Sequence, residues 1–269
     1  MNGPLKLMCV LAHPDDESLG TGGTLARYAA EGIETYLVTA TRGERGWFGD
    51  PKDYPGLQAL GKSREAELFA AAEVLGIRQV SFLDYVDGDL DQANPPQAVA
   101  KIVRHLRWAR PQVVVTFGPD GAYGHPDHIA ISQFTTAAAV CAADPWYADA
   151  DNLGSHRVAK LYYMVPTSAE LRAYQSVFGD QMMLVDGIER RGAGWQEWAI
   201  TTRVDTRDYW PTVWQAVACH QTQLPGYSAL KNLPEEHHRA LWGSRSYYRA
   251  YSTVNGGRRI ELDLFEGLR

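Results

Sequence analysis

Two short motifs in this chain bring together residue types that bind metal ions and move protons. The first spans residues 12–17, with the sequence Ala-His-Pro-Asp-Asp-Glu, and the second spans residues 123–128, with the sequence Tyr-Gly-His-Pro-Asp-His. Each follows an apolar run that predicts a strand, at residues 5–12 and 112–117. Because ligands of open α/β sheets bind outside the carboxyl ends of the strands, both motifs are expected at a binding edge.

The spacing of these residues predicts a metal centre. Pro126 suits a first helical turn, which puts His125 near the N-cap and His128 one turn in, facing the same way. The common doubly wound strand orders place the first and fourth strands side by side, so the motifs should share one crevice. Two imidazoles and one carboxylate, with positions left for water and substrate, describe a catalytic zinc site. The predicted ligands are His13, Asp16 and His128.

The remaining polar residues of the motifs suggest acid–base chemistry. Asp15 cannot easily face the same metal as its neighbour Asp16, but a carboxylate beside a metal-activated water suits a general base. His125 is predicted to stabilise an oxyanion as a cation, with Asp127 supporting its protonated form. Tyr123 offers a hydroxyl donor for the same charge.

Strands alternate with helices through the first half of the chain. The strand runs are nearly continuous in apolar residues, which is typical of a parallel sheet covered on both faces. The predicted fold is therefore α/β, a doubly wound, Rossmann-like, mostly parallel sheet with helices on both faces and a C-terminal extension. The predicted strands are 5–12, 35–39, 79–83 and 112–117, and the predicted helical segments are 24–30, 62–75, 96–110 and 127–143.

The pattern weakens beyond about residue 150, without a linker or an internal repeat. We therefore expect one domain over residues 1–269, in which 1–150 form the core and 151–269 form an extension that shapes the pocket. The segments that keep a pattern there are 160–165 and 199–204 as strands and 209–220 as a helix.

Composition limits the partners. The chain has 269 residues, 45% of them hydrophobic and 22% charged, which excludes a disordered protein. The formal charge is −6, and Lys and Arg are scattered, so the sequence shows no basic patch that would bind nucleic acid. No apolar run approaches the length of a membrane span. A small-molecule partner is expected. The three cysteines, Cys9, Cys141 and Cys219, fit buried positions in a reducing compartment, so we expect a cytoplasmic protein.

The two motifs resemble those of the LmbE-like, or PIG-L, zinc deacetylases, which remove acetyl groups from N-acetylglucosamine units. The match extends through 63–65, 83–88 and 220–223. The resemblance implies zinc-dependent hydrolysis of the N-acetyl group of such an amino sugar to acetate and the free amine. It implies the metal ligands and the base named above, His125 as acid or oxyanion stabiliser, and a homo-oligomer. Fe²⁺ or another divalent cation is an alternative to Zn²⁺.

Substrate contacts follow in part from the same resemblance. It implies that Arg64 and Asp87 contact sugar hydroxyls and that His220 lies near the pocket rim. The loop 41–61 is long for a βα connection, and such loops are usually functional or mobile. Trp47 in this loop is a candidate lid or substrate platform.

Other functions compete with deacetylation. The Tyr123-Gly124 pair is closest to the mycothiol-pathway deacetylase and its amidase relatives, so an amidase of bulkier thiol-sugar conjugates stays open. Two His and one carboxylate also form the facial triad of non-haem iron oxygenases, but those sites usually occur on all-β folds. A non-catalytic, metal-containing carbohydrate-binding protein would use the tryptophans of the last third of the chain.

A dinucleotide-binding function is disfavoured. The run Gly20-Thr21-Gly22-Gly23 follows a predicted strand, but the fingerprint needs a third glycine where Leu25 stands. It also needs an acidic residue at the end of the second strand, where residues 39–41 are Thr-Ala-Thr.

Overall fold

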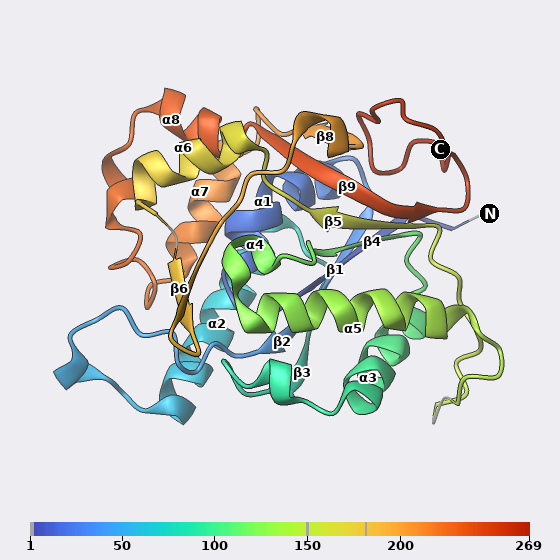
Figure 1. Ribbon diagram of the computed structural model, residues 1–269, viewed down its shortest axis with the longest axis horizontal. Helices are drawn as coiled ribbons and strands as arrows, with labels where there is room; N and C mark the ends of the chain where they lie inside the picture. The colour runs from blue at the N-terminus through green and yellow to red at the C-terminus, as the bar shows by residue number, and fades with distance from the viewer. Residues whose placement is uncertain (1–2, 149–150, 181) are drawn as a thin grey trace.

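A seven-stranded sheet forms the centre of the molecule (Figure 1). The computed structural model describes residues 3–148, 151–180 and 182–269. Strand order is β3-β2-β1-β4-β5-β9-β8; the first five of these run parallel, and β9 and β8 are antiparallel to their neighbours. The strands are β1 (Lys6–Leu11), β2 (Glu34–Thr41), β3 (Gln79–Tyr85), β4 (Val113–Phe117), β5 (Lys160–Met164), β8 (Thr202–Asp205) and β9 (Ser244–Ser252).

The order of the strands confirms the predicted doubly wound fold and the adjacency of the first and fourth strands. Strand β1 pairs with β2 on one side and with β4 on the other. Every residue of β4 is buried, as is all of β1 except Lys6, which explains their uninterrupted apolar sequences.

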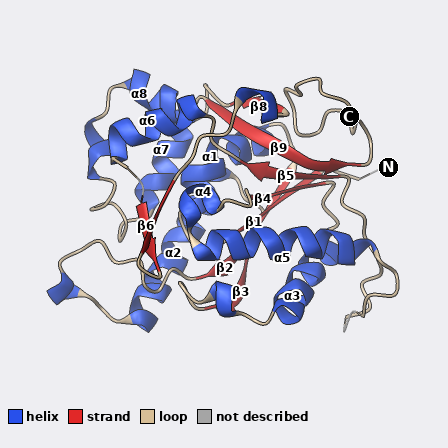
Figure 2. Cartoon of the chain, in the orientation of Figure 1, coloured by secondary structure: helices blue, strands red, loops and turns tan. Residues whose placement is uncertain are grey.

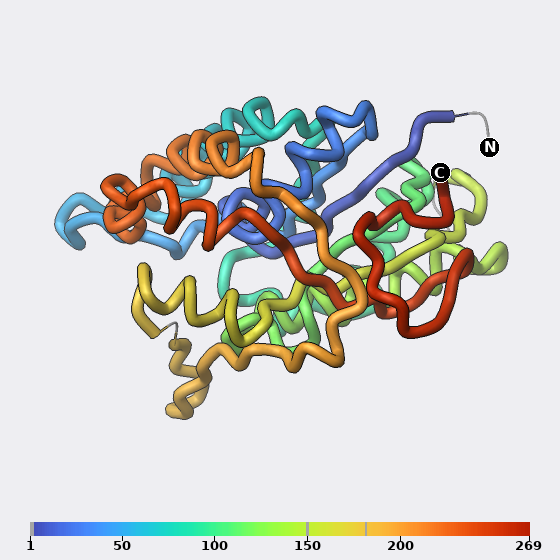
Figure 3. The backbone as a smooth tube through the Cα atoms, turned by 90° about the horizontal axis from the view of Figure 1, so that it is seen from above, coloured from blue at the N-terminus to red at the C-terminus, as the bar shows by residue number. Residues whose placement is uncertain are grey.

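Helices cover both faces of the sheet. Helices α1, α2 and α7 pack together on one face, and α3 packs on α5 on the other (Figure 3). Helix α3 begins where Asn94 accepts a hydrogen bond from Gln97 N at 3.1 Å. The helices are α1 (Asp16–Ala30), α2 (Leu57–Leu75), α3 (Pro95–Ala109), α4 (Gly121–Gly124), α5 (Pro126–Ala143), α6 (Ser168–Phe178), α7 (Trp210–Cys219) and α8 (Glu235–Trp242). No helix among these described segments has the length and apolarity needed to cross a membrane.

The C-terminal part contains most of the elements that the sequence did not predict. The predicted strand at 160–165 and helix at 209–220 are confirmed as β5 and α7. The strand expected at 199–204 is wrong in its bounds, because a 3-10 turn at Glu197–Ala199 precedes β8. Sequence patterning missed α6, α8, β9 and the separate hairpin of β6 (Met182–Val185) and β7 (Ile188–Arg191), visible in Figure 2.

A buried ion cluster joins the C-terminal segment to the sheet. The Glu261 carboxylate is 2.7 Å from Lys160 Nζ on β5 and 2.7 Å from Arg249 Nη1 on β9. It also accepts hydrogen bonds from Tyr162 and Thr202, at 2.6 and 2.9 Å. Because Lys160 is fully buried, this carboxylate is the counter-charge that keeps its ammonium group in the core.

We expect Glu261→Gln to lower the free energy of unfolding by about 3–5 kcal/mol, since it leaves Lys160 buried without a counter-charge. Urea denaturation measures the difference. Glu235→Gln is the control, because its exposed pair with Arg239 contributes at most about 1 kcal/mol. Equal losses in the two variants would contradict the role of the cluster.

The free energy of unfolding of Glu261→Gln should depend on pH differently from that of wild type. Burial raises the pKa of Glu261, but hydrogen bonds from Lys160 and Tyr162 outweigh burial and lower it from 4.5 to about 2. A depressed carboxyl pKa gives stability that is complete above pH 4.5 and is lost as the pH falls toward 2. Glu261→Gln should flatten this part of the stability profile.

Candidate active site

The first motif forms a tight turn between β1 and α1. The Asp16 carboxylate accepts the backbone N–H groups of Ala12 at 3.2 Å and His13 at 2.8 Å. Asp15 stands just before the helix with φ 101° and ψ −25°, a backbone conformation that costs a non-glycine residue about 1–3 kcal/mol. Helix α1 thus begins inside the motif, eight residues before the predicted helical segment at 24–30.

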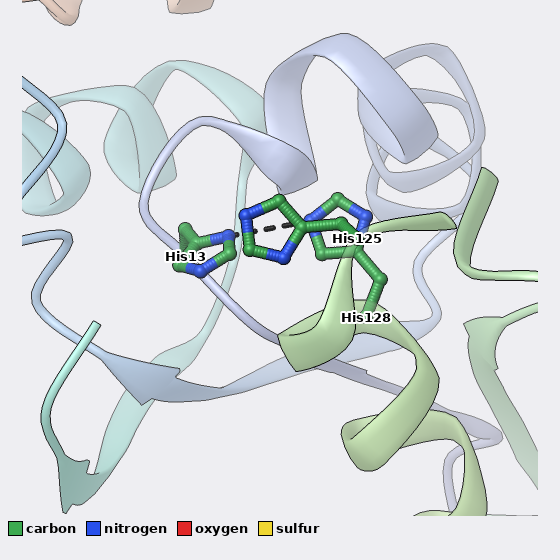
Figure 4. A group of neighbouring side chains, drawn as sticks. All are labelled: His13, His125 and His128. Carbon is green, nitrogen blue, oxygen red and sulfur yellow. Dashed lines mark hydrogen bonds between the residues drawn. The ribbon is translucent and has the colours of Figure 1, made fainter. Parts of the chain in front are cut away.

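The second motif forms the start of α5, as predicted. His125 is the N-cap residue, its Nδ1 accepts the backbone N–H of Asp127 at 3.2 Å, and Pro126 is the first helical residue. Figure 4 shows His125 and His128 reaching from α5 toward His13, which comes from the turn after β1. The rings of His125 and His128 stack with centroids 4.6 Å apart, and His128 stacks on Phe117 at 3.8 Å.

The three predicted metal ligands lie at mutual distances that suit one ion. His13 Nδ1 is 3.3 Å from His128 Nε2 and 3.7 Å from Asp16 Oδ2. Asp16 Oδ1 is 3.6 Å from His128 Nε2. Donors bound to one tetrahedral zinc ion lie about 3.4 Å apart. The ligand atoms of His13, His125 and His128 also fall within 4.8 Å of one another, so His125 borders the same space.

The electrostatics of the donor set also fit a cation. Burial and the neighbouring charges of Asp15 and Glu17 raise the pKa of Asp16 to about 7, although the charge of His13 lowers it. Burial and the charge of His13 lower the pKa of His128 well below 6.5, which keeps its ring neutral with a lone pair to donate. A bound divalent cation would relieve the crowding of negative charge at Asp16.

Two carboxylates orient His13 from its other side. His13 Nε2 lies 3.1 Å from both Asp87 Oδ1 and Asp127 Oδ2. Burial lowers the pKa of His13, but these hydrogen bonds and the charge of Asp16 raise it well above 6.5. A proton held on Nε2 leaves Nδ1 to face the donor set, which is how carboxylates commonly orient metal-binding imidazoles.

The Asp127 carboxylate does not make the contact with His125 that we expected from the sequence. Its carboxylate contacts His13 and accepts the backbone N–H groups of Gly88 at 2.7 Å and Leu90 at 3.1 Å, rather than pairing with His125. The direction of the side chain explains the difference, because only the backbone N–H of Asp127 reaches His125 among the described contacts.

The surroundings of His125 disfavour the cation that the sequence led us to expect. Burial and the charge of His13 lower its pKa to about 4, although Asp127 and Asp87 act in the opposite direction. Because Nδ1 accepts a backbone N–H, the proton of the neutral ring lies on Nε2. The Tyr123 ring lies edge-on to His125 and His128, with centroids 5.9 and 5.6 Å away, and burial raises its phenol pKa, so the hydroxyl stays protonated.

Asp15 faces a different set of groups from Asp16. Its Oδ2 accepts hydrogen bonds from Arg64 Nη2 at 3.1 Å and from the Tyr227 hydroxyl at 2.8 Å. Sequence reasoning missed Tyr227, which stands 212 residues away in a loop without a motif of its own. The nearest signal was the resemblance over 220–223.

Two of the residues predicted to contact substrate, Arg64 and Asp87, are engaged in hydrogen bonds within the protein. Arg64 is 3% exposed, and its guanidinium also donates to the carbonyls of Pro14 and Gly43, so it supports the turn around Asp15. Asp87 lies against His13 and accepts the backbone N–H of Arg45. Both side chains lie beside the metal donors, but hydrogen bonds within the protein already engage them.

The other two predicted contacts lie farther from the donors. His220 is fully buried rather than at a rim, and its Nε2 is 2.8 Å from Glu17 Oε1. Trp47 lies in the loop between β2 and α2, where its indole N–H donates to Asp50 O at 3.0 Å and its ring lies near Tyr54. No contact between Trp47 and the metal donors occurs among the described residues.

Comparison with known proteins identifies the family. The family model for PIG-L, described as GlcNAc-PI de-N-acetylase, matches residues 8–139. The chain is 32% identical to a 1D-myo-inositol 2-acetamido-2-deoxy-alpha-D-glucopyranoside deacetylase of Thermobispora bispora, covering 98% of each protein. It is 31% identical to a mycothiol S-conjugate amidase of Streptomyces coelicolor, covering 100% of this chain and 99% of the relative.

Solved structures agree on the fold. The N,N'-diacetylchitobiose deacetylase from Pyrococcus horikoshii superposes with a TM-score of 0.68 at 18% identity, over 91% of this chain and 83% of that one. The matched family region contains both motifs and therefore all three predicted metal ligands. From this similarity along the whole chain, together with the two motifs meeting at the edge of the sheet, we conclude that the protein belongs to the PIG-L (LmbE-like) family.

Proposed function

We propose that the protein is a metal-dependent hydrolase that removes the N-acetyl group from an N-acetylglucosamine-type sugar or glycoside, giving acetate and the free amine. The observation that carries this proposal is the convergence of His13, Asp16 and His128 on one point, with Asp15 in the adjoining turn. Family membership supports the reaction class, because relatives over the full chain length carry deacetylase names.

The metal we propose is Zn²⁺, with Fe²⁺ or another divalent cation able to use the same donors. His13, Asp16 and His128 would hold it. When bound, the metal supplies Lewis acidity, which polarises the acetyl carbonyl and lowers the pKa of a water molecule. Asp87 and Asp127 keep the ring of His13 turned toward this position.

Proton transfer is assigned to Asp15. The carboxylate takes a proton from the attacking water and returns it to the departing amine, while Arg64 and Tyr227 hold it in place. A neutral His125 donates a hydrogen bond from Nε2 to the developing oxyanion, and the Tyr123 hydroxyl is a second donor.

The first candidate substrate is 1D-myo-inositol 2-acetamido-2-deoxy-α-D-glucopyranoside. It is the compound named for the Thermobispora bispora relative, which matches the chain almost from end to end. The second candidate function is amide hydrolysis of a mycothiol S-conjugate, which the nearly equal similarity to the Streptomyces coelicolor amidase favours. Both reactions cleave an amide and place the same demands on the metal donors and the base.

Acetate release tests the reaction class. We expect release from one or more of N-acetylglucosamine, N,N'-diacetylchitobiose and the N-acetylglucosaminyl derivatives of inositol and malate. A chelator should abolish the release and added Zn²⁺ should restore it. A mycothiol S-conjugate in the same panel detects the second candidate through its amine product. A metal-loaded protein that acts on no member of this panel would contradict the proposal.

Asp15→Asn should reduce kcat by about 10²–10⁴-fold, because the amide cannot accept the proton. It keeps an oxygen for the donors Arg64 and Tyr227, so the turn should stay folded. Metal content measured by atomic absorption should equal that of wild type. Near-normal turnover would remove Asp15 from the role of base.

Asp127→Asn should weaken Zn²⁺ affinity by about 10–100-fold, because it removes the negative charge that orients His13. Competition with a chromogenic chelator measures this affinity. The control is Asp120→Asn, which alters a carboxylate of the neighbouring loop that bonds the Trp195 indole N–H at 3.0 Å. Unchanged Zn²⁺ affinity in Asp127→Asn would show that the orientation of His13 does not depend on this charge.

A further inference from the structure

The position of Asp15 depends on a backbone conformation that its own side chain does not favour. Its φ of 101° lies in the region that favours glycine, yet the residue carries a carboxylate and begins a helix. The carbonyl of Asp15 accepts ordinary first-turn hydrogen bonds from Ser18 and Leu19, at 3.1 and 2.9 Å. These bonds would form at the start of any helix and do not by themselves select this conformation.

The backbone N–H of Asp15 makes a further hydrogen bond. It donates to Glu17 Oε2 at 2.9 Å. Glu17 is fully buried in the first turn of α1, where the positive end of the helix dipole also favours a carboxylate. This hydrogen bond restrains the N–H of Asp15, because its acceptor is the fully buried side chain of Glu17.

The other oxygen of Glu17 is held from the C-terminal part of the chain. Glu17 Oε1 accepts the Ser18 hydroxyl at 2.5 Å and lies 2.8 Å from His220 Nε2. His220 follows the last residue of α7, a helix that packs on α1, and it is fully buried. The ion pair therefore fixes the rotamer of Glu17 from 203 positions away in the sequence.

We propose that Glu17, clamped by His220, is a positioning residue that holds the Asp15 backbone in its left-handed conformation and so aims the Asp15 carboxylate. This inference rests on the proposed function only in taking Asp15 as the base. Glu17 makes no contact with the metal donors among the described hydrogen bonds; it acts through the peptide N–H of Asp15. A displacement of about 1 Å at a reacting group can cost 10²-fold in rate.

Three variants test the inference. Glu17→Ala removes the acceptor, and we expect kcat to fall about 10–100-fold with KM within about threefold of wild type and full metal content. Glu17→Gln keeps an acceptor for the Asp15 N–H, and its amide can donate to the other tautomer of His220. This variant should recover kcat to within about threefold of wild type.

Glu67→Ala is the matched control. Glu67 on α2 holds the adjacent segment by accepting the backbone N–H and the hydroxyl of Thr222, at 2.8 and 2.7 Å, without a bond to Asp15. It should lose stability in urea denaturation and keep the kcat of wild type. A similar fall in kcat for Glu67→Ala and Glu17→Ala would overturn the proposal, as would a Glu17→Gln enzyme no better than Glu17→Ala.

Crystal structures of the variants give a readout that does not need activity. In Glu17→Ala we expect Asp15 to leave positive φ and its carboxylate to shift, whereas Glu17→Gln should keep both. An unchanged Asp15 in Glu17→Ala would overturn the inference, and so would loss of metal, because the effect would then run through Asp16. If wild type itself releases no acetate, the proposed function fails while the crystallographic comparison still decides the role of Glu17.

Discussion

Negative charge crowded into a buried turn is the constraint on which the site depends. Asp15, Asp16 and Glu17 are consecutive, and Asp87 and Asp127 approach the same space from two other loops. Burying a carboxylate is costly unless a cation or several hydrogen bonds compensate it. Arg64 compensates Asp15, His220 compensates Glu17, and His13 faces both Asp87 and Asp127. Asp16 is left with a raised pKa, at the point where the imidazoles converge.

The topology of the sheet supplies these compensating groups from distant parts of the chain. Parallel pairing of β1 with β4 places the turn after one strand beside the helix start after the other. Pairing of β2 with β3 brings the loops that carry Arg45 and Asp87 together, and the Arg45 N–H bonds the Asp87 carboxylate. Helix α7, packed on α1, delivers His220 from the opposite end of the sequence. The site is therefore a product of strand order more than of any single loop.

Sequence could predict the parts of this arrangement that depend on helix starts and on strand order. The start of α5 follows from Pro126, and the meeting of His13 with His128 follows from strand order, so both could be inferred before a structure. The partner of the Asp127 carboxylate could not, because it depends on which way one side chain turns within a crowded site. Tyr227 could not either, since its loop carries no periodic pattern and its reach to Asp15 is set by tertiary packing.

The predicted metal ligands and the groups that hold Asp15 come from different parts of the chain. The three predicted metal ligands and Asp15 all lie within residues 8–139, the segment that matches the family model. The groups that hold Asp15 from behind, Tyr227 directly and His220 through Glu17, lie outside it. The Asp15 carboxylate is thus held by two C-terminal side chains that do not contact the predicted metal ligands among the described hydrogen bonds. On the proposed mechanism, the position of the base therefore depends on segments of the chain other than those that carry the predicted metal ligands.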